Sequence, residues 1–378
     1  MPTTLADLTT LRVGGPAGRL VTAGSPDELL AAVQDVDARG DRLLLVAGGS
    51  NLVVSDEGFP GTVVHVRPPA ADAASGDLPG RADRAHPLAG VTVPDVGYCG
   101  GADVLVEAGV VWDDLVALAV AKGWSGLEAL SGIPGSVGAT PVQNVGAYGA
   151  EVADTVASVQ VWDRVEQRTR TLFNRDCAFS YRDSLLKRAA REGPDGGDRY
   201  VVLRVRFQLP VADLSAPVRY AELARRLGVG VGERAPLGAV REAVLALRAG
   251  KGMVLDRPEA PDPDTWSVGS FFTNPVVPAA ALPGSLDGAP RWPAGTGEDG
   301  AELVKLPAAW LIEHAGIAKG HGLPGPAAVS TKHTLALTNR GGARAADVVD
   351  LAREVRDAVR QAFGVVLVPE PRLVGVSL

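Results

Sequence analysis

The spacing of apolar residues predicts both helices and strands along this chain. Between residues 201 and 208, apolar positions alternate with mostly polar ones, and this period of two is typical of a strand with one buried face. The strongest helical pattern covers residues 345–363. Its apolar face comprises Val348, Leu351, Ala352, Val355, Val359 and Ala362. Gly364 then predicts the end of this helix.

An α–β unit is predicted near the N-terminus. Residues 25–28 read Ser-Pro-Asp-Glu. In this order the serine can cap a helix, the proline suits the first helical position, and the glutamate completes a capping box. Gly40 can close that helix. Residues 43–46 form a short apolar run, so we expect a buried strand that leads into a glycine turn at residues 48–51.

The remaining pattern is mixed, and it predicts an α+β protein of three parts. We expect helices at residues 113–122, 237–248 and 307–313, and strands at residues 156–162, 169–173, 365–368 and 373–376. Segments dense in Pro, Gly, Ala or Asp are expected to be surface loops or family-variable insertions. They are residues 68–87, 188–198, 256–264 and 278–300. We expect breaks between the parts near residues 75 and 255.

Composition limits the classes of function. The 378 residues correspond to two or three domains of roughly 150 residues each, and the 46 glycines and 28 prolines indicate many turns. The formal net charge of −7 disfavours nonspecific binding of nucleic acid, which needs a basic surface. It does not exclude an anionic small substrate, because local arginines can set the field of a pocket against the global charge.

Neither the cysteines nor the histidines indicate a metal site. Cys99 and Cys177 have no CxxC spacing and no nearby histidine, so we expect two buried free thiols and no metal. We expect His333 to be a structural residue in a strand. The first residues show no secretory signal, and no apolar stretch reaches about 18 residues. We therefore expect a cytoplasmic protein without membrane insertion.

Two glycine-rich segments are candidates for binding a phosphate. Glycines let backbone amides approach an anion, and serine and asparagine add side-chain donors. Taken alone, residues 48–51 favour a plain tight turn. The run from Ser131 to Gly149 is too long for one turn, and its interspersed isoleucine and valines indicate an ordered loop that suits a pyrophosphate. It is not the Rossmann fingerprint, because Pro141 interrupts any long helix after it.

Further candidates for chemistry are Tyr181-Arg182, Ser270 and Glu370. The first pair offers a ring for a flat cofactor and a cation for a carboxylate, but alone it favours a core tyrosine beside a surface arginine. Ser270 precedes two phenylalanines that would hold it rigidly, as a nucleophile, a proton donor or a plain turn serine. Glu370 lies between two prolines and could be a positioned acid, although a solvated loop glutamate is more common.

Together, the order of these segments and their amino-acid sequences closely resemble those of the UDP-N-acetylenolpyruvoylglucosamine reductase family. The similarity runs from Thr10-Leu11-Arg12-Val13-Gly14-Gly15-Pro16-Ala17 to Pro369-Glu370-Pro371-Arg372, nearly the whole chain. Its most specific parts are residues 131–149, Tyr181-Arg182-Asp183-Ser184, and Gly269-Ser270-Phe271-Phe272 with Asn274-Pro275.

The resemblance implies a fold and the function of each part of the chain. It implies a vanillyl-alcohol-oxidase type (PCMH-type) FAD-binding fold plus a smaller α/β substrate-binding domain. Residues 1–75 would form the first FAD-binding part, with residues 364–378 returning to it, and residues 76–255 would form the second. Residues 256–363 would bind the UDP-sugar. FAD would be held without a covalent bond, and NADPH would donate the hydride.

Family roles also carry over to matched positions. Arg182 and Glu370 would polarise the substrate carboxylate, and Ser270 would donate a proton. The substrate would be contacted by Tyr181, Tyr220, Lys251 and Asn274. The cofactor would be bound by Gly48, Gly49, Ser50, Asn51, Ser131, Gly132, Ile133, Pro134, Gly135, Ser136, Gly138, Ala139, Gln143, Asn144, Gly146, Ala147 and Tyr181.

The implied reaction reduces the enolpyruvyl group of UDP-N-acetylglucosamine enolpyruvate to UDP-N-acetylmuramate, for peptidoglycan precursors. Negative charge would develop at the carboxylate, where fixed donors lower the barrier. Glu370 would help only if it is protonated or orients another donor, because a bare carboxylate repels that charge. Two features depart from the family: Thr273 stands where lysine is common, and the segment 278–300 looks longer than usual.

Other classes remain open on the sequence alone. A flavin oxidase of different specificity is the nearest alternative, although many of these carry a histidine in the first glycine loop, which here reads Gly-Gly-Ser-Asn. A serine hydrolase using Ser270 would be colourless and labelled by fluorophosphonates, but its Gly-x-Ser-x-Gly elbow is incomplete. A nucleotide-sugar-binding protein without activity would not oxidise NADPH. The oligomeric state is open, with a monomer favoured.

Overall fold

The computed structural model describes residues 3–70, 88–97, 101–297 and 299–378. The chain divides into two compact units. The first comprises Met1–Pro16, Gly49–Phe59 and Gly250–Leu378, and the second comprises Ala17–Gly48 and Pro60–Ala249. Cys99 and most of the expected loop at residues 68–87 lie outside the described residues.

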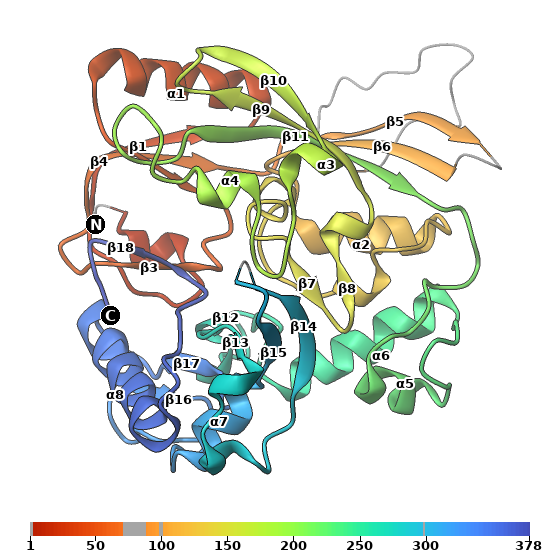
Figure 1. Cartoon of the computed structure of the whole chain (residues 1–378). Helices are drawn as coiled ribbons and strands as arrows, with labels where there is room; N and C mark the ends of the chain where they lie inside the picture. Colours follow the sequence, from red (N-terminus) through yellow and green to blue (C-terminus); the bar gives the residue numbers. More distant parts are fainter. Residues whose placement is uncertain (1–2, 71–87, 98–100, 298) are drawn as a thin grey trace. The chain divides into compact units, whose positions relative to one another are not determined.

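The second unit is built on a five-stranded antiparallel sheet of order β10-β9-β11-β6-β5 (Figure 1). A three-stranded sheet of order β1-β4-β2 accompanies it. The strands are β1 (Ala17–Ala23), β2 (Leu43–Val46), β4 (Phe59–Val66), β5 (Val91–Gly97), β6 (Gly101–Glu107), β7 (Gly146–Ala147), β8 (Ala150–Glu151), β9 (Val156–Asp163), β10 (Arg168–Phe173) and β11 (Tyr200–Leu209). The helices are α1 (Pro26–Arg39), α2 (Trp112–Ala121), α3 (Asn174–Cys177), α4 (Leu185–Arg188), α5 (Ala221–Leu227) and α6 (Leu237–Gly250).

A β-bulge in β11 directs the apolar residues that follow it into a different core from Val201 and Leu203. The alternation of residues 201–208 predicted one buried face. Instead, the register against β9 shifts between Val202 and Arg204, and one extra residue moves all later side chains to the opposite face. Val201 and Leu203 therefore pack against α1 and the small sheet. Val205 and Phe207 pack against α2 in a separate core.

Helix α1 begins and ends as its sequence predicts, except for one capping contact. The Ser25 hydroxyl accepts a hydrogen bond from the Glu28 amide at 3.2 Å, and Gly40 closes the helix with a φ of 65°, where glycine is favoured. The Glu28 carboxylate, however, accepts from the amide of Gly24 at 2.7 Å. The expected reciprocal capping box is therefore replaced by a contact one residue earlier.

The first unit is built around α8. Its strands are β3 (Leu52–Val54), β12 (Ser267–Ser270), β13 (Val276–Pro278), β14 (Trp292–Thr296), β15 (Glu302–Lys305), β16 (Ala327–Val329), β17 (Ala336–Asn339) and β18 (Arg372–Val374), and its helices are α7 (Ala308–His314) and α8 (Ala345–Phe363). The predicted bounds of α8 are confirmed, and Gly364 follows in the left-handed conformation. The apolar face of α8 packs with α7, β16 and β17 in one core, except for Ala362, which is exposed.

The sheets of the first unit are small. Strands β12, β17 and β16 form one antiparallel sheet, and β13, β15 and β14 form another. Near the C-terminus, β18 pairs in parallel with β3, which lies far away in the sequence. The mixture of helices and strands across the two units confirms the expected α+β class.

Some local predictions were wrong. Residues 365–368 do not form a strand. Their side chains alternate between buried and exposed, but Pro369 after them has no amide hydrogen to donate. Among the described residues, their backbone meets the neighbouring segment through the bond from the Thr273 amide to the Val368 carbonyl. His333 lies in the connection between β16 and β17 rather than in a strand, where the Ser330 hydroxyl accepts from the amides of both Lys332 and His333.

The segment at residues 278–300 is not simply a loop. It contains β14, which pairs with β15, together with two short 3₁₀ helices at Ala279–Ala281 and Gly284–Leu286. A loop composition rich in glycine and proline concealed this strand, since Pro293 and Gly295 lie inside it. Among the described residues, no helix has the length and apolar character needed to cross a membrane.

Candidate functional site

Two glycine segments of the second unit meet backbone to backbone. Gly48 follows β2, and a Cβ atom built on it would lie 2.8 Å from the Cα of Gly135, closer than real Cβ contacts allow. Gly135 itself has a φ of 122°, which side chains rarely adopt. The structure therefore brings together the two segments that the sequence expects to hold a pyrophosphate, and glycine is required at both contact points.

Many polar groups of residues 131–139 form hydrogen bonds within the protein. The Ser131 hydroxyl donates to the Glu128 carbonyl at 2.7 Å. The amides of Val137 and Gly138 donate to carbonyls in the turn before α2. Gly138 also packs so closely on Ala108 that a Cβ would lie 2.5 Å from that residue's own Cβ. These contacts fix the shape of the loop.

Only part of this loop remains able to bind an anion through its backbone. The amides of Ile133, Gly135 and Ser136 donate to no acceptor among the described residues, and Pro134 has no amide hydrogen. Successive amides in such a turn form an anion-binding concavity. The loop therefore fits a phosphate group, with a smaller set of donors than the sequence expected.

Asp113 anchors this loop, a role that the sequence does not indicate beyond a helix start. Its carboxylate accepts from the Gly132 amide at 2.6 Å and from both terminal nitrogens of Arg241 at 2.7 and 2.8 Å. Burial opposes ionisation of Asp113, but the hydrogen bonds from Arg241 and Gly132 outweigh it and hold its pKa below the ordinary value. A charged bridge thus ties α6 to the loop.

Arg182 lies in a strained turn of the same unit. The Asp183 amide donates to the Ser180 carbonyl at 3.2 Å, and Arg182 between them has a φ of 56°, which is unfavourable for a residue with a side chain. Its guanidinium lies 5.6 Å from the centre of the Tyr181 ring. It also donates to the Gly146 carbonyl at 2.8 Å. The predicted tyrosine–arginine pair is therefore attached to the glycine-rich run.

Tyr220 also contacts this run. Its ring meets that of Tyr148 edge to face, with centroids 5.5 Å apart, a favoured aromatic geometry. Tyr220 is 43% exposed, so much of it remains available for another contact. Gln143 and Ala147 are half-buried, whereas Ala139 is exposed.

In the first unit, the residues after Gly48 support the chain's C-terminal segment. A Cβ on Gly49 would lie 1.9 Å from the Leu8 carbonyl oxygen, so this position also requires glycine. The Asn51 side chain donates to the Glu370 carbonyl at 3.4 Å, and the Arg372 amide donates to the Asn51 carbonyl at 2.9 Å. Ser50 is half-buried beside them in the sequence.

The first unit brings Ser270 and Glu370 into one region. The Glu370 amide donates to the Phe271 carbonyl at 2.8 Å, and Phe272 forms a β-bridge with Pro369. As predicted, the two phenylalanine rings are buried, with centroids 5.1 Å apart. Ser270 ends β12 next to these rings and is half-buried. Apolar packing and a short ladder therefore hold both candidate catalytic residues.

Two further candidates lie elsewhere in the first unit. The Asn274 side-chain oxygen accepts from the Ala308 amide at 2.9 Å, which satisfies a donor at the start of α7. Lys251 follows α6 and is half-buried. Gly252 after it has a φ of 66°, and a Cβ there would lie 2.8 Å from the Asp264 carbonyl oxygen. The backbone beside Lys251 is therefore closely fixed.

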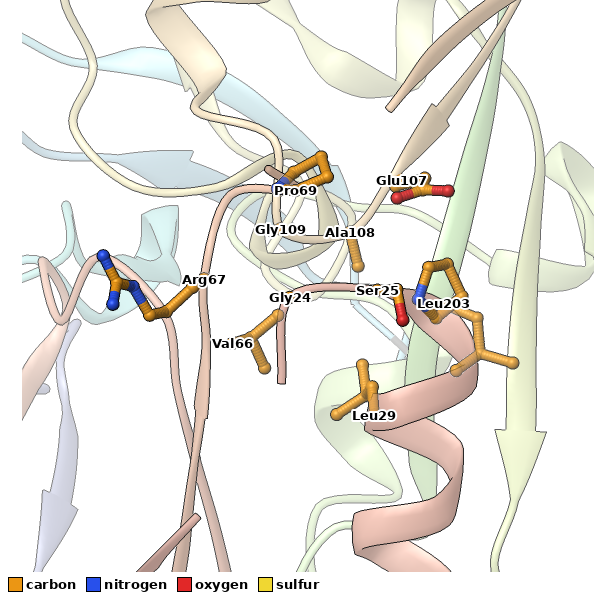
Figure 2. A pocket seen from close by; sticks show the side chains of 11 residues that line it. Gly24, Ser25, Leu29, Val66, Arg67, Pro69, Glu107, Ala108, Gly109 and Leu203 are labelled. Carbon is orange, nitrogen blue, oxygen red and sulfur yellow. The ribbon is translucent and has the colours of Figure 1, made fainter. Parts of the chain in front are cut away.

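A small hollow at the start of α1 does not fit a cofactor. Figure 2 shows its apolar lining, which includes Leu29, Val66 and Leu203, while the Arg67 guanidinium points away from them. Its volume of about 200 Å³ includes space open to solvent and is below the roughly 300–1,000 Å³ typical of ligand pockets. Among the described residues, no group of three or more His, Cys, Asp or Glu could hold a metal ion.

Two families of known proteins match separate parts of this chain. Residues 17–171 match the FAD binding domain family, and residues 261–374 match the family of the UDP-N-acetylenolpyruvoylglucosamine reductase C-terminal domain. These matches confirm the expected FAD-binding fold joined to a second domain.

Relatives and a solved structure cover nearly the whole chain. The UDP-N-acetylenolpyruvoylglucosamine reductase of Salinispora arenicola is 54% identical over 99% of this chain and 95% of its own length. That of Thermobifida fusca is 51% identical over 99% and 97%. The crystal structure of the reductase from Thermus caldophilus is 25% identical, with a TM-score of 0.60 over 98% of this chain and 97% of its own. The chain therefore belongs to the UDP-N-acetylenolpyruvoylglucosamine reductase family.

Proposed function

We propose that this chain reduces the enolpyruvyl group of UDP-N-acetylglucosamine enolpyruvate to UDP-N-acetylmuramate in peptidoglycan precursor synthesis, with non-covalently bound FAD and with NADPH. The observation that carries this proposal is the identity above 50% to reductases of this name along almost the entire chain. The matches to both the FAD binding domain and the reductase C-terminal domain support it. A serine hydrolase or a binding protein without activity would not account for these matches.

The glycine contact between Gly48 and Gly135 supports a cofactor phosphate beside it. We assign the pyrophosphate to the available amides of Ile133, Gly135 and Ser136, because oriented backbone donors suit an anion. The chemistry that FAD supplies when bound is hydride transfer, first from NADPH and then to the methylene carbon of the enolpyruvyl group. The first loop contains Gly49, Ser50 and Asn51 but no histidine, which favours non-covalent binding.

Arg182 and Glu370 would act on the substrate carboxylate. Negative charge builds up there when hydride reaches the methylene carbon, so a fixed guanidinium stabilises the transition state more than the ground state. The strained turn and the bond to Gly146 hold Arg182 in advance of the reaction. Glu370 would contribute in its protonated form or by orienting another donor, because an ionised carboxylate would repel the new charge.

Ser270 would donate the proton that completes the reduction. A serine hydroxyl is a weak acid, but the carbon next to the charged carboxylate is then strongly basic. The buried rings of Phe271 and Phe272 limit the movement of the serine backbone. Losing a positioned proton donor typically lowers a rate by about 10²–10⁴-fold.

The remaining assignments complete this proposal. Tyr181 would lie beside the flavin, and Tyr220, Lys251 and Asn274 would contact the UDP-sugar. Residues 1–75 with 364–378, residues 76–255 and residues 256–363 would be the three functional parts. We also propose a cytoplasmic location, because NADPH and nucleotide sugars are made there, and a monomer.

The visible spectrum of the purified protein tests the function directly. We expect flavin absorption that NADPH bleaches under anaerobic conditions and that the enolpyruvyl UDP-sugar restores, with UDP-N-acetylmuramate as product. Acid precipitation should release all the flavin. A colourless protein, or a reduced flavin that this substrate fails to reoxidise, would refute the proposal.

Replacing Ser270 by alanine separates the proton donor from the hydride steps. We expect Ser270→Ala to keep flavin reduction by NADPH nearly unchanged and to lower turnover by about 10²–10⁴-fold. Stopped-flow absorbance measures the first step, and product formation measures the second. Normal turnover in the variant would show that Ser270 is not the proton donor.

A further inference from the structure

The Asn144 side chain, expected from the sequence to bind the cofactor, is fully engaged within the second unit. Its amide nitrogen donates to the Glu151 carboxylate at 2.7 Å and to the Ser180 carbonyl at 3.0 Å. Its oxygen accepts from the Ala153 amide at 3.1 Å. A carboxamide has two N–H donors, so both donors of Asn144 are used, and the residue is fully buried.

The backbone at this position favours asparagine. Asn144 has a φ of 47°, and asparagine tolerates the left-handed region better than other residues with a side chain. Asn144 therefore has both a backbone role and a side-chain role. It lets the glycine-rich run turn after Gln143, and it sends a carboxamide toward the turn at residues 180–183.

The turn at residues 180–183 contains Arg182, and further hydrogen bonds connect this part of the chain to the glycine-rich run. Ser184 is fully buried, and its hydroxyl donates to the Val142 carbonyl at 2.5 Å. Arg182 donates to the Gly146 carbonyl at 2.8 Å, and the Lys187 ammonium donates to the Arg182 carbonyl at 2.9 Å. A backbone as strained as that of Arg182 persists only where neighbouring groups determine it.

We propose that Asn144 is a positioning residue for Arg182: by holding the Ser180 carbonyl, it fixes the turn that aims the guanidinium. The inference rests on the proposed function, in which Arg182 acts on the substrate carboxylate. It assigns Asn144 to the step that consumes the substrate rather than to binding of FAD. Glu151 shares this role, because it accepts the second donor and fixes the orientation of the carboxamide.

Asn144→Ala tests this assignment through the separate half-reactions of the flavin-loaded enzyme. We expect the dissociation constant of FAD and the limiting rate of flavin reduction at saturating NADPH to stay within about threefold of the wild-type values. Reoxidation by the enolpyruvyl UDP-sugar should slow by about 10–100-fold, the size of effect that a displacement of about 1 Å at a reacting group produces. The rate constant at saturating substrate should fall more than the affinity.

Asn174→Ala is the matched control. The Asn174 side chain also donates to two backbone carbonyls of this unit, those of Ala153 and Val156, at 2.9 and 2.8 Å. Neither of these bonds involves the Arg182 turn. Both half-reactions should therefore stay within about threefold in this variant. Equal slowing in Asn174→Ala and Asn144→Ala would overturn the inference, because it would indicate a general loss of order.

Asn144→Asp provides a second variant that keeps the shape and the left-handed backbone. Two carboxylates would then meet at the Glu151 contact, and one would take up a proton more readily because like charges disfavour double ionisation. The defect in flavin reoxidation should therefore shrink as the pH is lowered from 8 to 6, relative to the wild type. A defect independent of pH would count against the inference.

The outcomes distinguish this inference from the proposed function. A raised dissociation constant of FAD with unchanged reoxidation would make Asn144 a cofactor ligand and overturn the inference. Unchanged values in every assay would overturn it as well. If the wild-type enzyme is reduced by NADPH but is not reoxidised by the enolpyruvyl UDP-sugar, the proposed function itself fails.

Discussion

The glycine-rich run of the second unit and the Ser270–Glu370 region of the first unit are held in different ways. Asp113 and Ser184, which lie outside the run, bind its backbone, and Asn144 within it binds the Ser180 carbonyl. Around Ser270 and Glu370, the backbone is held by a short ladder over two buried phenylalanine rings. The first region is fixed by directed hydrogen bonds, and the second mainly by apolar burial.

This difference matches what each region is proposed to do. Backbone donors that bind a phosphate must reach the surface of a loop. In the run, polar anchors fix the loop in addition to the burial of Val137 in the core. A serine that protonates carbon needs a rigid position, and close-packed rings supply rigidity because cores tolerate little displacement. We therefore expect substitutions in the two regions to change different measured quantities. The largest loss of stability is expected at the phenylalanines.

Phe271→Ala should have the largest effect. Removing a fully buried ring from this core should lower the free energy of unfolding by about 3–5 kcal/mol. Denaturation by urea, followed by tryptophan fluorescence, measures the change. Phe173→Ala is the control, because Phe173 is 56% exposed, and it should change stability by no more than about 0.5 kcal/mol. Similar losses in the two variants would contradict apolar burial as the support of the Ser270 segment.

Gly48→Ala should act mainly on the cofactor. The new Cβ would press on the Gly135 backbone, and overpacking of this kind costs about 1–3 kcal/mol, which corresponds to roughly 10–100-fold weaker binding of FAD. Titration of the apoprotein with FAD, followed by flavin fluorescence, measures it. Gly238→Ala in α6 adds a Cβ with no neighbouring atom within 4 Å and should leave FAD binding unchanged. Equal affinity for FAD in the wild type and both variants would show that the contact between Gly48 and Gly135 is not part of the cofactor site.

Asp113→Asn should have the smallest effect, and that effect should depend on pH. Because the folded-state pKa of Asp113 is lowered, its ionised form stabilises the fold above the ordinary value near 3.9. This stabilisation is lost as the pH falls through the lowered pKa. At pH 7 we expect a loss of no more than about 1 kcal/mol in the variant, and the difference from the wild type should shrink as the pH falls below the ordinary value of the carboxyl. The urea midpoints of unfolding across this pH range test the prediction. Asp114→Asn is the control, because Asp114 is exposed. A difference in stability that grows on acidification would contradict a lowered pKa of Asp113.

Much of the local structure could be predicted because it depends on spacing between near neighbours in the chain. Helix α8 and strand β2 have the predicted bounds, since a period of 3.6 or a short apolar run reports burial directly. The β11 strand was predicted, but its bulge was not. A bulge leaves each side chain's polarity unchanged and alters only which core it enters, so the alternation looked the same.

The candidate site was predictable as a set of segments and not as an arrangement. Glycines in unusual number, Phe271-Phe272 and the prolines around Glu370 are visible in the sequence as departures from ordinary patterns. The anchors were not visible, because Asp113 in a helix's first turn and Asn144 in a glycine loop look like a common helix start and a common turn residue. Whether such a side chain meets water or a distant carbonyl leaves no local trace.

The sequence by itself determined where most of the helices and strands form, which segments are rich in glycines that let a backbone approach a phosphate, and the family that the residues of those segments resemble. Tertiary structure decided that Gly48 meets Gly135, that Asn144 holds the Ser180 turn, and that the Glu370 amide binds the Phe271 carbonyl. The physical reason is that periodicity arises from neighbours a few residues apart. Contacts between distant residues are selected by the burial and hydrogen bonding of the whole chain.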